Sequence, residues 1–302
     1  MDKLILMYHS VDSAEHPAVA GAFPFPFERF KAQVQRAVDA GYRPERISRL
    51  HHPHPDKTLY VTSDDGTVDW CRNALPWCEA KGIPTHTAII TGPWEATPVY
   101  PLAHIIQLIL TSRPQHELEA LAQRLHRDHL DAAQLAYIEG KYHYETLFYR
   151  RVIKGAFNLV FERDQAYEAL GELTASEHAQ LRARFARPEA YQPFALAELG
   201  VHTRSHWALD QDTQRYFDDE IQQSRQTMID AGVRPGRVYT SPMQPRFGAR
   251  LEDLQPLLQE AGYQGVMTSN PGVWNQKDFI IPRIDAARVE AHLDAVDASP
   301  SA

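Results

Sequence analysis

The feature that most constrains this 302-residue chain is a helix ending that recurs along it. Four helical patterns stop at a glycine, and a bulky residue then begins the return toward a strand. The four pairs are Gly41-Tyr42, Gly82-Ile83, Gly232-Val233 and Gly262-Tyr263. Glycine adopts the left-handed conformation that ends helices without a Cβ penalty. The recurrence predicts an α/β protein in which parallel strands alternate with helices.

Short β-rich runs and amphipathic helical patterns alternate at both ends of the sequence. The expected strands are 4–11, 58–63, 85–90, 237–242, 265–269 and 279–284, and the expected helices are 27–40, 70–81, 213–231 and 251–261. A barrel and an open doubly wound sheet both fit, and in either one ligand sites gather at the carboxyl ends of the strands. From about residue 100 to 194 the sequence is mostly helical, which we interpret as an insertion in a single domain (1–302).

Charge and cysteine content limit the possible partners and compartments. The chain has 31 Lys and Arg against 39 Asp and Glu, a formal charge of -8, which disfavours nucleic acid and anionic membranes as partners. Cys71 and Cys78 lie about 10 Å apart on an expected helix, too far for a disulfide. The opening "MDKLILMYHSV" is too short for a signal peptide, and no later run reaches the ~20 apolar residues of a membrane span. We expect a soluble cytoplasmic protein without a transmembrane segment; its oligomeric state stays open.

His202 and His206 stand four residues apart in "LGVHTRSHWALD". On a helical turn this spacing puts both imidazoles on one face, an arrangement that a divalent metal can use. The spacing is common by chance in a chain with 15 histidines, so it needs support from its context. The pair follows the apolar stretch "FALAELGV", which places it where a strand end passes into a loop.

Asp64 and Asp65 close the run "TLYVTS" and precede Gly66. Neighbouring side chains of a regular strand point to opposite faces, but a glycine can turn the backbone so that both carboxylates reach one pocket. One carboxylate and two histidines make a three-ligand set with an open position, as expected of a catalytic zinc site. The other carboxylate can then stay ionised and act as a general base.

The stretches "YVTSDDGTVD", "GVHTRSH" and "LILMYHSV" resemble those of the polysaccharide deacetylases, the NodB-homology carbohydrate esterases. The stretch "ALPWCEAKGIPTHTAIITG" adds to the resemblance, which covers residues 1 to about 92 and about 196 to 285. It implies a distorted (β/α)7-type barrel and a hydrolase that removes N-acetyl groups from amino sugars. The implied substrate is an N-acetylated sugar of a cell-surface polysaccharide, such as lipopolysaccharide O-antigen or capsule, or its cytoplasmic glycan precursor.

By this resemblance Asp64 is the general base, and Asp65, His202 and His206 hold a divalent metal. Zn²⁺ is the expected ion, with Co²⁺, Ni²⁺, Mn²⁺ and Fe²⁺ as alternatives. The backbone N-H of Met243 matches the family's oxyanion donor, which requires no particular side chain.

The sequence departs from the family pattern in three ways. Ser63 replaces an aromatic residue, and Thr240 stands where the family has an arginine that orients the base. Arg246 and Arg283 are the candidates for the missing charge near the substrate. The family's late Leu-x-His motif for the general acid has no convincing copy, so His9 in the Y-H-x-V opening is the candidate acid or substrate contact.

Three alternatives stay open at this stage. The missing arginine and acid also fit a catalytically degenerate member that binds glycan or metal without turnover. Two histidines and one carboxylate also form non-haem iron centres, although the alternation of strands and helices argues against that fold class. A deformylase or another C-N hydrolase acting on a small molecule would need the same groups.

Overall fold

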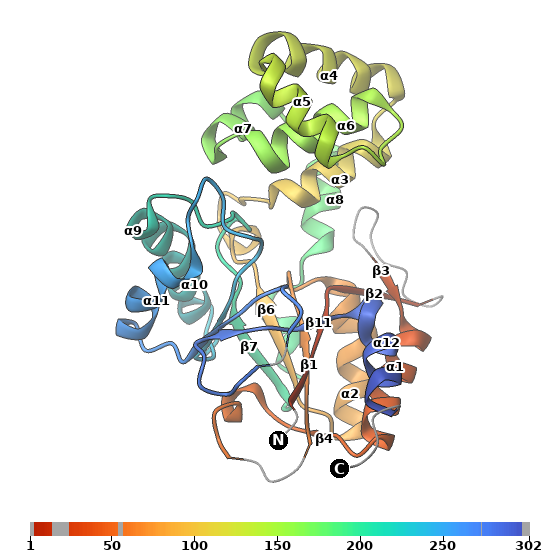
Figure 1. Cartoon of the computed structure of the whole chain (residues 1–302), viewed down its shortest axis with the longest axis vertical. Coiled ribbons are helices and arrows are strands. Elements are labelled where there is room, and N and C mark those ends of the chain that lie inside the picture. The colour runs from red at the N-terminus through yellow and green to blue at the C-terminus, as the bar shows by residue number, and fades with distance from the viewer. Residues whose placement is uncertain (1–2, 14–23, 54–56, 273, 298–302) are drawn as a thin grey trace. The chain divides into compact units, whose positions relative to one another are not determined.

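The computed structural model describes residues 3–13, 24–53, 57–272 and 274–297, which divide into two compact units (Figure 1). The first unit comprises Met1–Val99 and Ala183–Ala302, and the second comprises Tyr100–Arg182. In the part of the chain so described, no helix combines the length and apolar character that a bilayer span requires. The single domain with an insertion at about 100–194 stays a prediction.

The first unit contains parallel strands joined by helices. Its elements are β1 (Lys3–Tyr8), β2 (Ser10–Asp12), β3 (Pro24–Pro26), α1 (Phe27–Asp39), β4 (Arg43–Pro44), η1 (Ile47–Arg49), β5 (Thr58–Ser63), η2 (Trp70–Ala74), α2 (Leu75–Lys81), β6 (Thr85–Ile89), η3 (Gly92–Trp94), η5 (Pro188–Tyr191), β7 (Ala197–Val201), α9 (Thr213–Tyr216), η6 (Phe217–Gln222), α10 (Gln223–Asp230), β8 (Val238–Thr240), α11 (Leu251–Glu260), β9 (Gly265–Met267), β10 (Ile280–Ile281), β11 (Ile284–Asp285), η7 (Ala286–Arg288) and α12 (Val289–Asp297). The α/β alternation expected from the sequence is confirmed.

The helix-ending glycines explain this alternation. Gly41, Gly82, Gly232 and Gly262 have φ values of 86°, 68°, 75° and 84°. These are left-handed conformations, in which a residue with a Cβ would be strained. Each helix therefore stops where the sequence indicates, and the chain returns toward the amino end of the next strand.

The strands form two main parallel sheets. The larger has the order β11-β1-β5-β6-β7, with β4 also paired to β5, and the smaller has the order β10-β9-β8. Because β10 and β11 belong to one extended segment, this segment joins the two sheets on one side. On the other side β7 and β8 share no ladder, although the Gly236 N-H donates to the Leu199 carbonyl at 2.7 Å. A closed seven-stranded barrel stays a prediction.

Both faces of the strands are buried. Alternate residues such as Leu4, Leu6, Leu59 and Val61 belong to the main core, which includes residues of the flanking helices. In Figure 1 the helices α1, α2 and α12 lie together beside the sheet. Residues on the other face form a second apolar cluster that draws on strands of both sheets: Ile5, Ile47, Leu50, Tyr60, Val238, Met267, Trp274 and Ile281. Burial on both faces is typical of parallel sheets.

The second unit is helical. It comprises α3 (Leu102–Ser112), α4 (Gln115–His129), α5 (Ala132–Lys141), α6 (Phe148–Gly155), η4 (Ala156–Val160), α7 (Arg163–Leu170) and most of α8 (Ala175–Arg184). Helices α5 and α6 approach closely because Gly155 lacks a side chain; a Cβ there would lie 2.2 Å from Ile138 Cγ2. Arg113 holds α8 to the end of α3 through two hydrogen bonds to Glu177, of 2.6 and 3.0 Å.

Candidate metal and catalytic site

The paired acids follow the end of β5. The Asp64 N-H donates to the Tyr8 carbonyl at 2.9 Å and so continues the alignment of β5 with β1 for one residue. The chain then turns through two left-handed residues, Asp65 (φ 73°) and Gly66 (φ 72°). A Cβ on Gly66 would lie 2.8 Å from Ile89 Cδ1, so the turn also requires a glycine for space. After this turn, Asp64 Oδ2 and Asp65 Oδ1 both lie within 4.0 Å of His202 Nε2.

The histidine pair follows the end of β7. The His202 N-H donates to the Ile89 carbonyl at 2.9 Å, and the next residues form a loop. Thr203 (φ 70°) and His206 (φ 60°) are left-handed, so the pair lies in a loop after the strand and not on a helical turn. The two imidazoles nevertheless lie side by side, with ring centroids 5.0 Å apart. The loop, and not a helix, therefore brings the rings together.

Asp65, His202 and His206 converge on one point. Asp65 Oδ1 lies 3.4 Å from Nε2 of each histidine, and one ligand atom from each of the three residues falls within 4.8 Å of the others. His202 Nε2 is buried and has no hydrogen-bond partner among the described residues. Buried polar atoms almost always have a partner. A carboxylate and two imidazoles whose donor atoms face each other in this way fit a divalent metal ion.

The orientation of His202 is set by the second sheet. His202 Nδ1 lies 2.9 Å from the carbonyl oxygen of Thr240, the last residue of β8. An Nδ1-H that donates to this carbonyl leaves Nε2 with its lone pair toward Asp65, as a metal ligand requires. Burial lowers the pKa of His202, but the Asp64 and Asp65 carboxylates outweigh this effect and raise it overall.

Asp64 is paired with the arginine from the β10–β11 segment. Both terminal nitrogens of Arg283 donate to the Asp64 carboxylate, each at 2.7 Å. Arg283 is itself held by the Thr268 carbonyl at 3.0 Å and the Thr62 hydroxyl at 3.1 Å. Burial alone would raise the pKa of Asp64, but the guanidinium lowers it to about 2. Asp64 is therefore ionised throughout the physiological pH range.

His9 lies on the open side of this pair. Its Nε2 is 3.9 Å from Asp64 Oδ2, and 38% of its side chain is exposed, whereas the Asp64 side chain is buried. The same carboxylate oxygen lies 4.0 Å from His202 Nε2. Asp64 Oδ2 therefore lies within 4.0 Å of both a candidate metal ligand, His202, and a histidine that solvent reaches, His9.

The other two candidate residues have different surroundings. Arg246 places its guanidinium over the rings of Trp207 and Phe247, at 5.1 and 4.7 Å from their centroids. Met243 follows β8, and its carbonyl accepts a hydrogen bond from the Ser241 hydroxyl at 3.1 Å. Of the two arginines considered for the missing charge, Arg283 is the one that contacts Asp64. The roles assigned to Arg246 and Met243 stay predictions.

Two buried residues near the site, Asp69 and His86, do not stand out in the sequence. Asp69 accepts hydrogen bonds from the Ser10 hydroxyl and the Val11 N-H, and so joins residues 64–69, which we call the acid loop, to the start of β2. His86 on β6 is fully buried, and burial lowers its pKa to about 3. A Cβ on Gly200 would lie 2.4 Å from His86 Cε1, so this glycine of β7 makes room for the ring. The only sequence signal for this packing is the glycine within the strand sequence "AELGV", because a glycine inside a strand often marks the close approach of another group.

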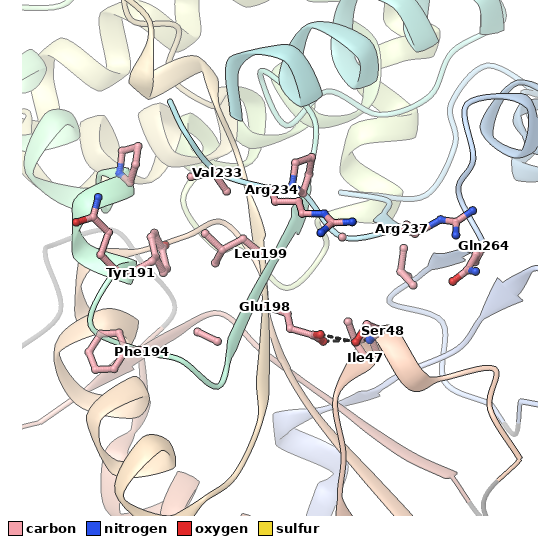
Figure 2. A pocket seen from close by; sticks show the side chains of 16 residues that line it. Ile47, Ser48, Tyr191, Phe194, Glu198, Leu199, Val233, Arg234, Arg237 and Gln264 are labelled. Carbon is pink, nitrogen blue, oxygen red and sulfur yellow. Dashed lines mark hydrogen bonds between the residues drawn. The ribbon is translucent and has the colours of Figure 1, made fainter. Parts of the chain in front are cut away.

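A cavity of about 570 Å³ lies at the opposite ends of the strands (Figure 2). It is bordered by the first residues of β7 and β8 and by side chains such as Tyr191, Phe194 and Arg234. Glu198 in this cavity accepts hydrogen bonds from the Ser48 N-H and hydroxyl. None of the site residues predicted from the sequence lines it.

Comparison with known proteins gives a structural match. Neither a protein-family model nor a curated protein sequence matches the chain. A de-N-acetylase from Aggregatibacter actinomycetemcomitans is 13% identical with a TM-score of 0.56, over 96% of this chain and 99% of that one. IcaB from Ammonifex degensii is 14% identical with a TM-score of 0.54, over 98% and 97%. A polysaccharide deacetylase from Bacillus cereus is 13% identical with a TM-score of 0.50, over 97% and 69%.

The chain has the polysaccharide deacetylase fold. The structural match covers nearly the whole chain, whereas the motif resemblance covers residues 1 to about 92 and about 196 to 285. In this fold the Asp64-Asp65 pair and the His202-His206 pair lie at the carboxyl ends of β5 and β7, where parallel α/β proteins place their ligand sites.

Proposed function

We propose that this chain is a metal-dependent deacetylase that hydrolyses the N-acetyl group of an amino sugar in a cell-surface polysaccharide or its precursor. One observation carries the proposal: Asp65, His202 and His206 converge beside a second, buried and ionised carboxylate, Asp64. The polysaccharide deacetylase fold supports the same conclusion. The distorted barrel, Zn²⁺ as the ion and a cytoplasmic location belong to this proposal.

Asp65, His202 and His206 would hold the metal. When bound, a divalent ion supplies Lewis acidity toward an amide carbonyl and lowers the pKa of water. Asp64 Oδ2 faces this site and is the atom that accepts the proton of the attacking water. Arg283 holds the carboxylate in place through both oxygens, which leaves it one orientation.

The leaving amine needs a proton, and His9 is placed to deliver one. Its ring is partly exposed and lies 3.9 Å from Asp64 Oδ2. A proton taken up by Asp64 can therefore reach the amine through His9 or through solvent beside it. The N-H of Met243 remains our candidate donor to the developing oxyanion.

Acetate release from N-acetylated oligosaccharides by the Zn²⁺-loaded protein tests this proposal. Asp64→Asn removes the proton acceptor but keeps the size of the side chain, so we expect a loss of about 10²–10⁴-fold in kcat. Glu198→Gln, at the opposite end of the strands, is the matched control. Full activity of the Asp64→Asn variant would contradict the role of Asp64.

The same experiment addresses the non-catalytic alternative. Zn²⁺ binding without acetate release from any acetylated sugar would indicate a glycan-binding protein. The non-catalytic alternative was suggested in part by the absence of the family's arginine at position 240. Arg283 pairs with Asp64 in its place, which weakens that alternative. Formate release without acetate release would instead indicate a deformylase.

A further inference from the structure

A short segment after the helical unit is bound to the acid loop. We call residues 184–186 the strap. Phe185 forms an isolated antiparallel bridge with Thr67, and the Ala186 N-H donates to the Gly66 carbonyl at 2.9 Å. Phe185 and Ala186 are both buried. The strap therefore binds the two residues that directly follow Asp65.

The strap is itself anchored on its far side. Trp94 Nε1-H donates to the Ala186 carbonyl at 2.8 Å. Ala186 thus has one backbone group bonded to the acid loop and the other to the segment after β6. A backbone fixed on both sides holds the acid loop in place better than a mobile loop does.

Arg184, the first residue of the strap, is 1% exposed. Burying a guanidinium is costly unless acidic groups surround it. The acids whose charges act on Arg184 are Asp69 and Asp65, in that order, although burial is the larger influence and lowers its pKa to about 10. The strap, whose residues 185 and 186 bond to Thr67 and Gly66, thus brings a buried cation next to the acid loop.

The acid loop needs such support because its conformation is strained. Asp65 has a φ of 73°, a left-handed conformation that a residue with a side chain keeps only where its surroundings fix it. On one side Asp69 fixes the loop to Ser10 and Val11. On the other side the strap does so through Gly66 and Thr67.

We propose that Arg184 is a positioning residue, which together with the strap holds Asp65 in the orientation that binds the metal. The inference rests on the metal site of the proposed function. It assigns a role in the site to the junction where the chain leaves the helical unit. Groups that orient metal ligands typically change metal affinity 10–100-fold when they are removed.

Isothermal titration of Zn²⁺ into the metal-free full chain tests the inference. We expect Arg184→Met to weaken Zn²⁺ binding 10–100-fold, and Arg184→Lys, which keeps the charge, to recover most of this loss. Arg237→Met is the matched control, since Arg237 caps the Gly262 carbonyl at the opposite end of β8, and it should bind Zn²⁺ like the unmodified chain.

The sign of the effect decides between positioning and simple repulsion. A guanidinium that only repelled the ion would make Arg184→Met bind Zn²⁺ more tightly, and that result, like an unchanged affinity, overturns the inference. If Arg184→Met does not fold, Arg184→Gln takes its place with the same expected loss. Recovery of Zn²⁺ affinity in Arg184→Lys separates a positioning role from a general loss of stability. Thermal unfolding of each variant measures that loss of stability.

Asp65→Asn separates this inference from the proposed function. If Asp65→Asn leaves Zn²⁺ binding unchanged, the metal site itself is wrong. If Asp65→Asn abolishes binding but Arg184→Met does not change it, the site stands and only the positioning role of Arg184 fails.

Discussion

Strand β7 carries a polar side chain near each end, and the two have opposite surroundings. Near the amino end, Glu198 is satisfied by the N-H and hydroxyl of Ser48. Just beyond the carboxyl end, His202 meets Asp64 and Asp65, with left-handed backbone at Asp65 and nearby residues. Figure 2 shows the amino-end cavity with its Glu198–Ser48 hydrogen bond.

The two ends of β7 differ in how their ionisable groups are paired. The Glu198 carboxylate beside the amino-end cavity has hydrogen-bond partners and contributes to structure and orientation. Ionisable side chains that converge on a left-handed backbone lower the free energy of unfolding. Such strained and destabilising arrangements are concentrated at functional sites. This difference supports our proposal that the functional site lies at the carboxyl ends of the strands, and substitutions at either end of β7 test it.

The largest expected effect is that of Arg283→Met. It leaves the buried Asp64 carboxylate without its cation, and breaking a buried ion pair in this way costs about 3–5 kcal/mol. We expect a large fall in the unfolding temperature and a pKa of Asp64 well above its present value of about 2. Denaturant unfolding measures the first. A loss below about 1 kcal/mol would show that the pair does not stabilise this end of the strands.

The pH dependence of stability tests the pairing of Asp64 at the carboxyl end of the strands. The pKa of Asp64 is depressed from 3.8 to about 2. A depressed carboxyl contributes stability that is fully present above its unfolded pKa and is lost as the pH falls through about 2. The contribution is on the order of 2 kcal/mol. We expect the free energy of unfolding to fall more steeply between pH 4 and 2 in the unmodified chain than in Asp64→Asn; equal slopes would contradict the pairing.

Gly66→Ala tests the strain of the acid loop. The new Cβ would meet Ile89 Cδ1 at 2.8 Å, and φ is 72°. Left-handed backbone on a residue with a side chain costs about 1–2 kcal/mol, so we expect a stability loss of this order together with weaker Zn²⁺ binding. Gly41→Ala is the control, because Gly41 has a φ of 86° but no atom within 4 Å of its Cβ position. It should lose stability without losing Zn²⁺ affinity.

The smallest effect is expected at the amino end. Glu198→Gln keeps an oxygen that can accept from Ser48, so we expect stability to change by less than about 0.5 kcal/mol. Acetate release should stay within twofold, or about 0.4 kcal/mol of activation free energy. A loss comparable to that of Asp64→Asn would remove the distinction between the two ends of β7.

Much of the fold followed from local features of the sequence. Glycine stops, such as Gly82 and Gly262, need only their own backbone and helix to be recognised, and both take the expected left-handed conformation. The proximity of Asp64 and His202 also followed, because carboxyl ends of parallel strands meet at one edge. Periodicity and strand polarity are local properties, so a single sequence reveals them.

The remaining parts of the site depend on contacts between distant segments. Arg283 reaches Asp64 across 219 positions, and the sequence offered Arg246 as an equal candidate. The left-handed φ values of Thr203 and His206 were not predicted, because the spacing of two histidines does not reveal such a conformation in a non-glycine residue. No local pattern marks Arg184 as a buried neighbour of the acid loop.

The hydrogen bond between His202 and Thr240 crosses the seam between β7 and β8, where the two sheets share no ladder. An ion held by Asp65 and His202 would thus brace the two sheets against each other, with the imidazole as the link. Occupancy of the site and closure of the seam are then thermodynamically linked, so a chelator should loosen β8 and β9 before it affects β1 and β5.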